Sequence, residues 1–149
     1  MPSAPEDSIP TLADIHAAAG LIKGEIHRTP VITCASLNAG VGAELYFKCE
    51  NFQRTGSFKF RGATNAVKSL SPDEAAQGVA THSSGNHGAA LAAVAKTAGL
   101  AAKIVVPKNA ARIKQENILL HGAELIHCEP TLEARDTKLA EVVAGSGCA

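Results

Sequence analysis

A helical pattern of apolar residues opens the chain. Between residues 12 and 26, apolar side chains recur at every third or fourth position, which is the spacing of one helix face. Thr11 precedes this segment and Asp14 follows three residues later, so the pair can form a capping box at the helix N-terminus. Residues 1–10 are acidic and rich in proline, and we expect them to form a disordered leader. Pro30 ends this first element.

The next elements are a strand and two helices. The segment ELYFKC at 44–49 alternates apolar and polar side chains, which predicts a strand. A helix is expected from about Ser57 to Leu70. The tetrapeptide SPDE at 71–74 then supplies a capping serine, a proline at the first helical position and acidic residues in the first turn. This combination predicts the start of another helix.

From Gly78 onward, short apolar runs alternate with helical segments. The starts of the apolar runs lie about 20–25 residues apart, which is the spacing of crossover units in a parallel sheet. The sequence therefore predicts a three-layer α/β domain of order βαβαβα, with a parallel sheet and right-handed crossovers. The expected elements are strand 79–81, helix 86–98, strand 103–106, a helix capped by Asn109 and ending at 121, strand 124–128, and a helix capped by Thr131 and ending near Val143.

Composition and charge narrow the class of protein. The chain has 149 residues, about one domain's length, with 14 basic and 14 acidic side chains. A net charge of zero argues against non-specific nucleic-acid binding, which requires an excess of Lys and Arg. The most apolar stretch, residues 89–106, is interrupted by Lys96 and Lys103, so no membrane span is expected. The core must be built mainly from aliphatic side chains, because aromatic residues make up only 3% of the chain.

The cysteines and the N-terminus indicate the compartment. The four cysteines form no CxxC pair and have no histidine at the spacing of a metal finger, so we expect reduced thiols and no metal site. The N-terminus lacks the basic region and apolar stretch of a signal peptide. We therefore expect a cytoplasmic protein.

The loop HSSGNHG at 82–88 is the first candidate for chemistry. It follows the first strand of the alternating segment, and ligands of a parallel sheet gather beyond the carboxyl ends of the strands. It brings two hydroxyls, an amide and two imidazoles to a helix N-terminus, where free backbone N–H groups favour a carboxylate or a phosphate. The alternative is a polar turn in which a serine or asparagine only caps the helix.

The segment NFQRTGSFKFRG at 51–62 is the second candidate. It places Lys59 in the first turn of a helix, between Phe58 and Phe60. Apolar neighbours and a helix N-terminus both disfavour an ammonium ion, and Schiff-base chemistry with an aldehyde requires a neutral lysine. The alternative is a surface lysine that extends past two core aromatics, with Arg54 and Arg61 as solvated charges.

These motifs carry a resemblance to a known family. ENFQRTGSFKFRGATNAV at 50–67 and THSSGNHGAALA at 81–92 resemble the fold-type II pyridoxal-phosphate enzymes, and within them the serine racemase and serine/threonine dehydratase branch. IHRTP at 26–30, VVPKNA at 105–110 and HGAEL at 121–125 match in the same order. The resemblance implies the cofactor pyridoxal 5'-phosphate, racemisation or dehydration of serine or threonine, and a homodimer when the protein is full length.

The resemblance also implies a role for each site residue. Lys59 would form the aldimine with the cofactor and move the substrate's α-proton on one face, and Ser84 would act on the opposite face. Phe58 would pack near the cofactor ring, and Asn86 would hydrogen-bond its phenolic oxygen. The substrate carboxylate would be held by the loop residues Ser83, Ser84, Gly85, Asn86 and His87.

Enzymes of this family are about twice as long as this chain. The resemblance implies that residues 11–50 belong in part to the larger domain and that residues 51–149 form the small domain. The rest of the larger domain, with its glycine-rich phosphate loop and divalent-metal site, has no counterpart in the sequence. Arg54 and Thr55 match positions implicated in ATP activation of a full-length form, although Cys34-Ala35-Ser36 departs from the serines expected nearby.

Two hypotheses remain open at this point. In the first, the 149 residues are the N-terminal portion of a pyridoxal-phosphate-dependent racemase or dehydratase. In the second, they form a catalytically inactive α/β module that lacks the phosphate loop and pairs with another subunit.

Overall fold

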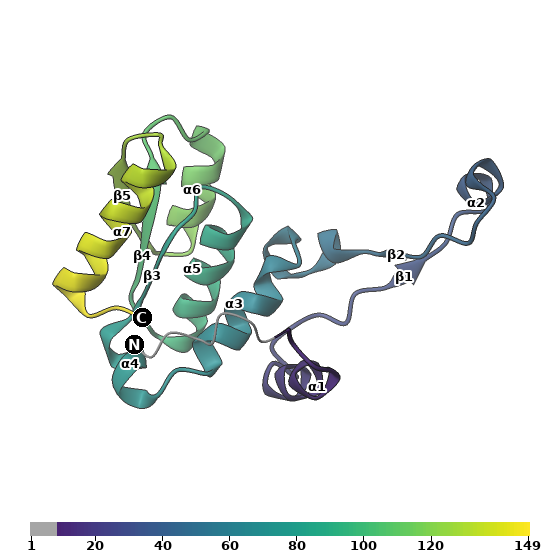
Figure 1. The fold of residues 1–149 in the computed structure, drawn as a ribbon, viewed down its shortest axis with the longest axis horizontal. Coiled ribbons are helices and arrows are strands. Elements are labelled where there is room, and N and C mark those ends of the chain that lie inside the picture. The colour runs from purple at the N-terminus through teal and green to yellow at the C-terminus, as the bar shows by residue number, and fades with distance from the viewer. Residues whose placement is uncertain (1–8) are drawn as a thin grey trace.

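The computed structural model describes residues 9–149, and residues 1–8, most of the expected leader, lie outside them. The chain forms an α/β body, and a thin arm projects away from it (Figure 1). The body contains the three strands that follow Gly78, as the sequence predicts. The helix α1 (Leu12–Leu21) lies beside the junction of body and arm (Figure 1).

The sheet of the body consists of three parallel strands. β3 (Val79–His82), β4 (Ala102–Pro107) and β5 (Glu124–Cys128) are arranged in the order β3-β4-β5. The central strand β4 is the most apolar, and its residues Ile104, Val105 and Val106 have no exposed surface. Such near-continuous burial is typical of a parallel strand that is covered on both faces. The predicted parallel sheet is confirmed.

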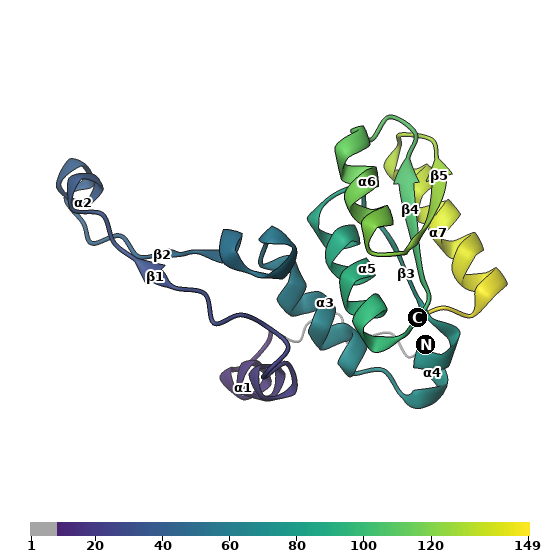
Figure 2. The ribbon, with the colours of Figure 1, turned by 180° about the vertical axis from the view of Figure 1, so that it is seen from behind.

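Helices cover both faces of this sheet, which confirms the three-layer architecture. α5 (Asn86–Ala98) and α6 (Arg112–Leu120) lie on one face, and α7 (Leu132–Ser146) lies on the other (Figure 2). α3 (Lys59–Lys68) packs on the outside of α5 and is followed by α4 (Pro72–Gln77). The side of α3 that is buried carries residues at helical spacing: Phe60, Ala63, Thr64 and Val67.

Three of the predicted helix caps are confirmed, and one prediction is wrong. Thr11 and Ser71 form capping boxes, and the Thr131 hydroxyl accepts a hydrogen bond from the Ala134 N–H at 3.1 Å. Asn109 does not cap α6, because the chain first makes a turn in which the Ala110 N–H donates to the Pro107 carbonyl at 2.9 Å. The helix therefore begins after Ala111, which has no side-chain cap.

The first helix ends earlier than its apolar pattern predicts. α1 stops at Leu21, whereas the pattern continues to Ile26. Gly24 then adopts a left-handed backbone with a φ of +88°, which glycine tolerates without steric cost. The resulting turn buries Ile22 and packs Ile26 against the hydrophobic core.

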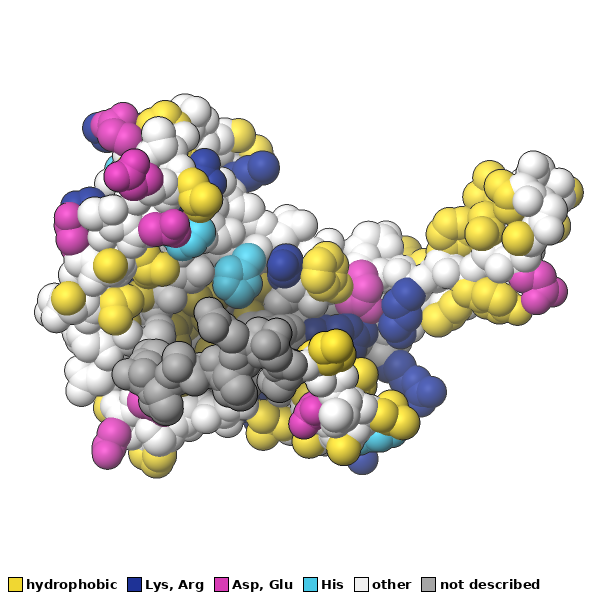
Figure 3. All heavy atoms as spheres, in the orientation of Figure 1, with side chains coloured by type: hydrophobic (Ala, Val, Ile, Leu, Met, Phe, Trp, Pro, Cys, Tyr) yellow, Lys and Arg dark blue, Asp and Glu magenta, His cyan; other side chains and the backbone are white. Residues whose placement is uncertain are grey.

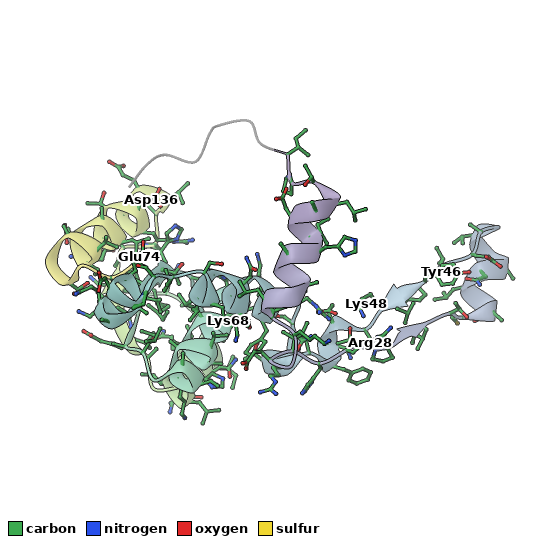
Figure 4. The ribbon with its side chains drawn as sticks, turned by 90° about the horizontal axis from the view of Figure 1, so that it is seen from below. Arg28, Tyr46, Lys48, Lys68, Glu74 and Asp136 are labelled. Atoms are coloured by element: carbon green, nitrogen blue, oxygen red, sulfur yellow. The ribbon has the colours of Figure 1, made fainter. Side chains whose placement is uncertain are left out.

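The arm, residues 31–48, differs most from the expectation. The predicted strand 44–49 is reduced to β2 (Phe47–Lys48), which pairs antiparallel with β1 (Val31–Ile32). Between them lies α2 (Ala35–Val41), which the sequence analysis did not predict. Tyr46 lies at the far end of the arm beside α2, and Lys48 lies closer to the body (Figure 4).

The arm is covered by nothing in the described structure. None of residues 31–48, all of which the structure describes, is buried. Hydrophobic side chains gather on its surface, as Figure 3 shows. The large exposed ones are Val31, Ile32, Leu37, Val41, Tyr46 and Phe47. A two-stranded ribbon with no buried face is marginal by itself in water.

Within residues 9–149, no helix combines the length and the apolar character needed to cross a membrane.

Candidate functional site

The two candidate segments meet where α5 begins. The loop at 82–88 joins β3 to α5, and the turn at 53–58 leads into α3, which packs against α5. Within that turn, the 3-10 helix η2 (Arg54–Gly56) also contacts α5. The fold therefore brings together two motifs that lie more than 20 residues apart in the sequence.

The loop after β3 ends in a helix N-terminus that no side chain caps. Gly85 occupies the N-cap position of α5, and its own N–H donates to the Ser83 hydroxyl at 3.3 Å. Within the described residues, the N–H groups of Asn86, His87 and Gly88 have no backbone acceptor. The alternative of a serine or asparagine that only caps the helix is therefore wrong. Uncapped N–H groups at a helix N-terminus are able to donate hydrogen bonds to an anion.

The start of the loop is held to the sheet and to α7. The Ser83 N–H donates to the Val105 carbonyl at 3.0 Å, which continues the hydrogen bonding of β3 with β4. His82, the last residue of β3, places its Nε2 atom 3.1 Å from Asp136 Oδ1 on α7. Both contacts fix the direction in which Ser83 and Ser84 leave the sheet.

Lys59, the first residue of α3, is exposed. Its Nζ atom lies 5.1 Å from the centroid of the Phe58 ring and has no hydrogen-bond or salt-bridge partner within residues 9–149. The exposure of Lys59 confirms the alternative's surface lysine, and Phe60 is buried as that alternative expects. Phe58, however, is 59% exposed, so it is not a core aromatic. A free amine beside an exposed aromatic ring leaves both groups available to a ligand.

His87 links the loop to the lysine electrostatically. Burial lowers the pKa of His87, and the nearby charges of Lys59 and His82 lower it further. Its side chain also lines a cavity of about 190 Å³ with Thr81 and Leu91. At neutral pH the His87 imidazole is therefore uncharged and can still donate one hydrogen bond.

The turn before α3 contains a strained residue. Thr55 has a φ of +59°, which is unfavourable for a β-branched side chain. Its hydroxyl and that of Ser57 are buried without a hydrogen-bond partner among the described residues. Arg54 is exposed and lines a second cavity of about 190 Å³, together with Phe60 and Val94. The assignment of Arg54 and Thr55 as nucleotide contacts stays a prediction.

An ion pair holds the first turn of α3 to the base of the arm. Arg61 donates to both carboxylate oxygens of Glu50, from Nε at 2.9 Å and from Nη2 at 2.7 Å, and the Thr29 hydroxyl donates to Glu50 Oε1 at 2.6 Å. Arg61 is therefore not a solvated charge, as the alternative for this motif had it. The side-chain amide of Gln53, which is buried, exchanges two hydrogen bonds of 2.9 Å with the backbone of His27.

The charge of Glu50 should make this ion pair sensitive to acid. Hydrogen bonds from Arg61 lower the pKa of Glu50 from 4.5 to about 2, against a smaller opposing effect of burial. Because the pKa is lower in the folded state, the ion pair stabilises the fold above pH 4.5, and this contribution is lost as the pH falls toward 2. We expect Glu50→Gln to lower the free energy of unfolding at pH 7 by about 2 kcal/mol.

Urea unfolding between pH 2 and pH 7 measures this effect. The free energy of unfolding of Glu50→Gln should fall less between pH 4.5 and pH 2 than that of the wild type. Glu25→Gln is the matched control, because Glu25 pairs with Lys68 at 3.2 Å with both side chains more than a third exposed. Equal pH dependence of the wild type and Glu50→Gln would contradict the assignment.

The residues present fit part of a pyridoxal-phosphate site. Lys59 offers an unpaired amine for the cofactor's aldehyde, Phe58 an exposed aromatic surface, and the exposed Asn86 a side-chain amide at the start of α5. The N-terminus of α5 offers N–H donors for an anionic group. Within residues 9–149, no group of three or more His, Cys, Asp or Glu side chains is arranged to hold a metal ion.

Sequence reasoning missed the residues that support the site. Glu50 and Gln53 lie inside the motif at 50–67 but were given no role, and the pair of His82 and Asp136 joins residues 54 positions apart. The only signal for Glu50 was its opposite charge to Arg61, and nothing in the sequence indicated Asp136.

Comparisons with known proteins identify the family of this chain. The model of the family "Pyridoxal-phosphate dependent enzyme" matches residues 22–149. A serine racemase of Dictyostelium discoideum is 46% identical over 93% of this chain and 43% of its own length. A beta-hydroxyaspartate dehydratase of Paracoccus denitrificans is 46% identical over 93% of this chain and 44% of its own length.

A solved structure also matches the fold. The structure of maize serine racemase superposes with a TM-score of 0.88 at 42% identity, covering 91% of this chain and 41% of the maize chain. The present chain thus spans less than half the length of these relatives. Since the family model matches most of the sequence, the chain belongs to the family of pyridoxal-phosphate-dependent enzymes.

Proposed function

We propose that this chain is the lysine-bearing part of a pyridoxal-phosphate-dependent enzyme that racemises or dehydrates serine. The observation that carries the proposal is the meeting of an unpaired lysine, Lys59, with an uncapped helix N-terminus at the loop 83–87. The first provides an amine for the cofactor, and the second provides donors for an amino-acid carboxylate.

The chain's own residues would divide the chemistry between two faces of the substrate. Lys59 would hold the cofactor, which would supply an electron sink for charge that develops at the α-carbon. Once the substrate's amino group has displaced Lys59 from the cofactor, the freed Lys59 Nζ would take the α-proton on one face, and the Ser84 hydroxyl would give a proton on the other, which inverts the configuration. If the β-hydroxyl leaves instead, taking a proton to form water, the result is dehydration. The N–H groups of Asn86 and His87 hold the carboxylate, and Phe58 packs beside the cofactor ring.

The names of the relatives support serine as the proposed substrate. The Dictyostelium and maize proteins are serine racemases, and the Paracoccus protein acts on a β-hydroxy amino acid. Serine is therefore the first substrate to test, and threonine, which also carries a β-hydroxyl, is the second. ATP and a divalent metal belong to the same proposal as ligands of a full-length form.

The domain organisation is also part of the proposal. Residues 51–149 form the small domain, and residues 11–50 belong in part to a larger domain that covers the apolar arm. The exposed arm supports this arrangement, as does the length of the relatives, which exceeds twice that of this chain. It equally favours the second candidate function, an inactive module that pairs with another subunit through the arm. In either case a second polypeptide or domain packs on residues 31–48.

Treatment with pyridoxal phosphate tests the proposal. We expect the purified chain to develop a new absorption band, and borohydride reduction to leave a pyridoxyl group on Lys59 that peptide mass spectrometry locates. Absence of the adduct at saturating cofactor would favour the inactive module.

The role of Ser84 is tested by measuring the products formed from L-serine. The test uses protein that is loaded with pyridoxal phosphate and turns over L-serine. We expect Ser84→Ala to lower D-serine formation at least about 100-fold, the effect of removing a general acid or base, while pyruvate formation falls much less. Ser69→Ala, an exposed serine near the end of α3, is the control. Equal loss of both products in Ser84→Ala would refute the assignment of two acid–base groups.

A further inference from the structure

We propose that Glu50 and Arg61 are positioning residues for Lys59, because their ion pair fixes the rotation of the first turn of α3. This inference rests on the proposed function, since it concerns the direction in which Lys59 presents its amine to an aldehyde. It assigns a role to two residues whose side chains, within residues 9–149, make no hydrogen bond to the loop at 83–87 or to Lys59.

The geometry of the helix explains how a residue on one side can direct a residue on the other. Successive residues of an α-helix are rotated by about 100°, so Lys59 and Arg61 lie about 160° apart around the axis of α3. Phe60 lies between them on the buried side that packs against α5. Arg61 thus faces the base of the arm, and Lys59 faces away from it, on the side from which its charge affects His87.

Glu50 binds Arg61 through both of its carboxylate oxygens. Its two oxygens accept three hydrogen bonds of 2.6–2.9 Å, two from Arg61 and one from Thr29. The side chains of Arg61 and Glu50 are only 28% and 18% exposed, so water competes weakly for these bonds. A two-pronged contact of this kind fixes orientation as well as distance.

The segment that carries Glu50 is itself fixed, which makes the contact a rigid reference. Lys48 Nζ donates to the Thr29 carbonyl at 2.8 Å, and Gln53 is bonded twice to the backbone of His27. Arg61 Nη2 also reaches the His27 carbonyl at 3.3 Å. The turn at 27–29, the segment 48–53 and the first turn of α3 therefore form one hydrogen-bonded unit.

Besides the packing of Phe60 against α5, the ion pair is the main side-chain contact of the first turn of α3. No side chain caps this helix, and Phe58 at its N-cap is exposed. The turn before it contains the strained Thr55. Loss of the Glu50 carboxylate or of the Arg61 guanidinium should therefore let this turn fray. The Lys59 side chain would then sample many directions.

Two aldehydes distinguish positioning from a general change in lysine reactivity. Formation of the pyridoxal phosphate adduct depends on the direction of Lys59. Pyridoxal phosphate is bulky and anionic, so its anionic group must reach hydrogen-bond donors of the protein while its aldehyde reaches the amine. Formaldehyde approaches from any side, and reductive methylation of Lys59 reports only the reactivity of the amine. Both reactions are followed by peptide mass spectrometry, with Lys96 as the internal reference.

We expect Glu50→Gln and Arg61→Lys each to need at least five times more pyridoxal phosphate for half-maximal trapping at Lys59. Methylation of Lys59 should change less than twofold in both variants. Arg61→Lys keeps the positive charge but loses the paired hydrogen bonds from Nε and Nη2. It is the milder change, and it serves as the test if Glu50→Gln folds poorly. Glu25→Gln, which removes the ion pair at the other end of α3, should trap the cofactor as the wild type does.

The other outcomes overturn the inference. Unchanged trapping in a folded Arg61→Lys or Glu50→Gln variant means that the ion pair does not position Lys59. Parallel changes in trapping and methylation mean that it acts on the charge of the amine.

If the wild-type chain itself forms no adduct, the proposed function fails, and amide hydrogen exchange then decides on the ion pair alone. The inference expects exchange at Phe60 and Arg61 to accelerate at least tenfold in either variant, with no change in β4. Unaltered exchange at these amides would refute it.

Discussion

A Gly88→Ala substitution is expected to lower the free energy of unfolding of this chain by about 3 kcal/mol. Gly88 lies in the first turn of α5, where a Cβ atom would come within 2.4 Å of the Ser83 carbonyl oxygen. The same atom would lie 3.1 Å from Ile104 Cγ2 and 3.3 Å from Ile118 Cδ1, both of which are fully buried. Neither the backbone carbonyl nor the two core side chains can move without disturbing the loop or the sheet.

Urea unfolding followed by far-ultraviolet circular dichroism measures this loss. Gly62→Ala is the matched control, since Gly62 also lies within a helix but has open space around its position. Alanine is favoured over glycine in a helix, so this control should gain about 0.5–1 kcal/mol. A Gly88→Ala variant as stable as the wild type would mean that Gly88 does not lie against the Ser83 carbonyl and the two core isoleucines as described.

Lys59→Ala is expected to abolish the borohydride-stable pyridoxyl adduct. At the pyridoxal phosphate concentration that half-saturates the wild type, the amount of trapped cofactor should fall at least a hundredfold. Lys59 is exposed and has no polar partner within residues 9–149, so its removal should leave the free energy of unfolding within about 0.5 kcal/mol of the wild type. Loss of the adduct with unchanged stability would therefore identify the amine itself.

Lys68→Ala is the control for this experiment. Lys68 lies on the same helix and is also exposed, but its amine pairs with Glu25. Its variant should trap the cofactor at Lys59 as the wild type does. An adduct that persists in Lys59→Ala at the wild-type level would place the reactive amine elsewhere in the chain.

The body of the fold could be predicted from the sequence because its signals are local. α5 begins at Asn86 and ends before Gly99, as predicted, since its alanine-rich run is bounded by glycines on both sides. β5 also has its predicted bounds, 124–128. In both cases propensity, hydrophobic pattern and turn residues agree, and tertiary contacts had nothing to correct.

The arm could not be predicted, because its elements depend on partners that are distant in the sequence. β1 has only two residues, and it exists because Val31 pairs with Lys48, 17 positions later. The early end of α1 has a similar cause. Ile22 and Ile26 continue the helical pattern, but burial against the core favours a turn at Gly24 over a further helical turn.

The motifs of the candidate site could be predicted from the sequence, but the residues that hold these motifs in place could not. The loop 83–87 and Lys59 stand out in the sequence because several functional groups are concentrated at two helix starts. The linear sequence does not reveal that Glu50 accepts two hydrogen bonds from Arg61, or that His82 lies against Asp136. Those contacts depend on how helices and strands pack, and a linear pattern of residue types does not contain that information.

The position of Tyr46 determines what intrinsic fluorescence can report on this protein. The chain has one tyrosine and no tryptophan, and Tyr46 is 67% exposed at the far end of the arm. Its emission will hardly respond when the α/β body unfolds, so circular dichroism has to follow that transition. A change in its emission or in its quenching by iodide would instead register a polypeptide that binds the arm, and it does so without any added label.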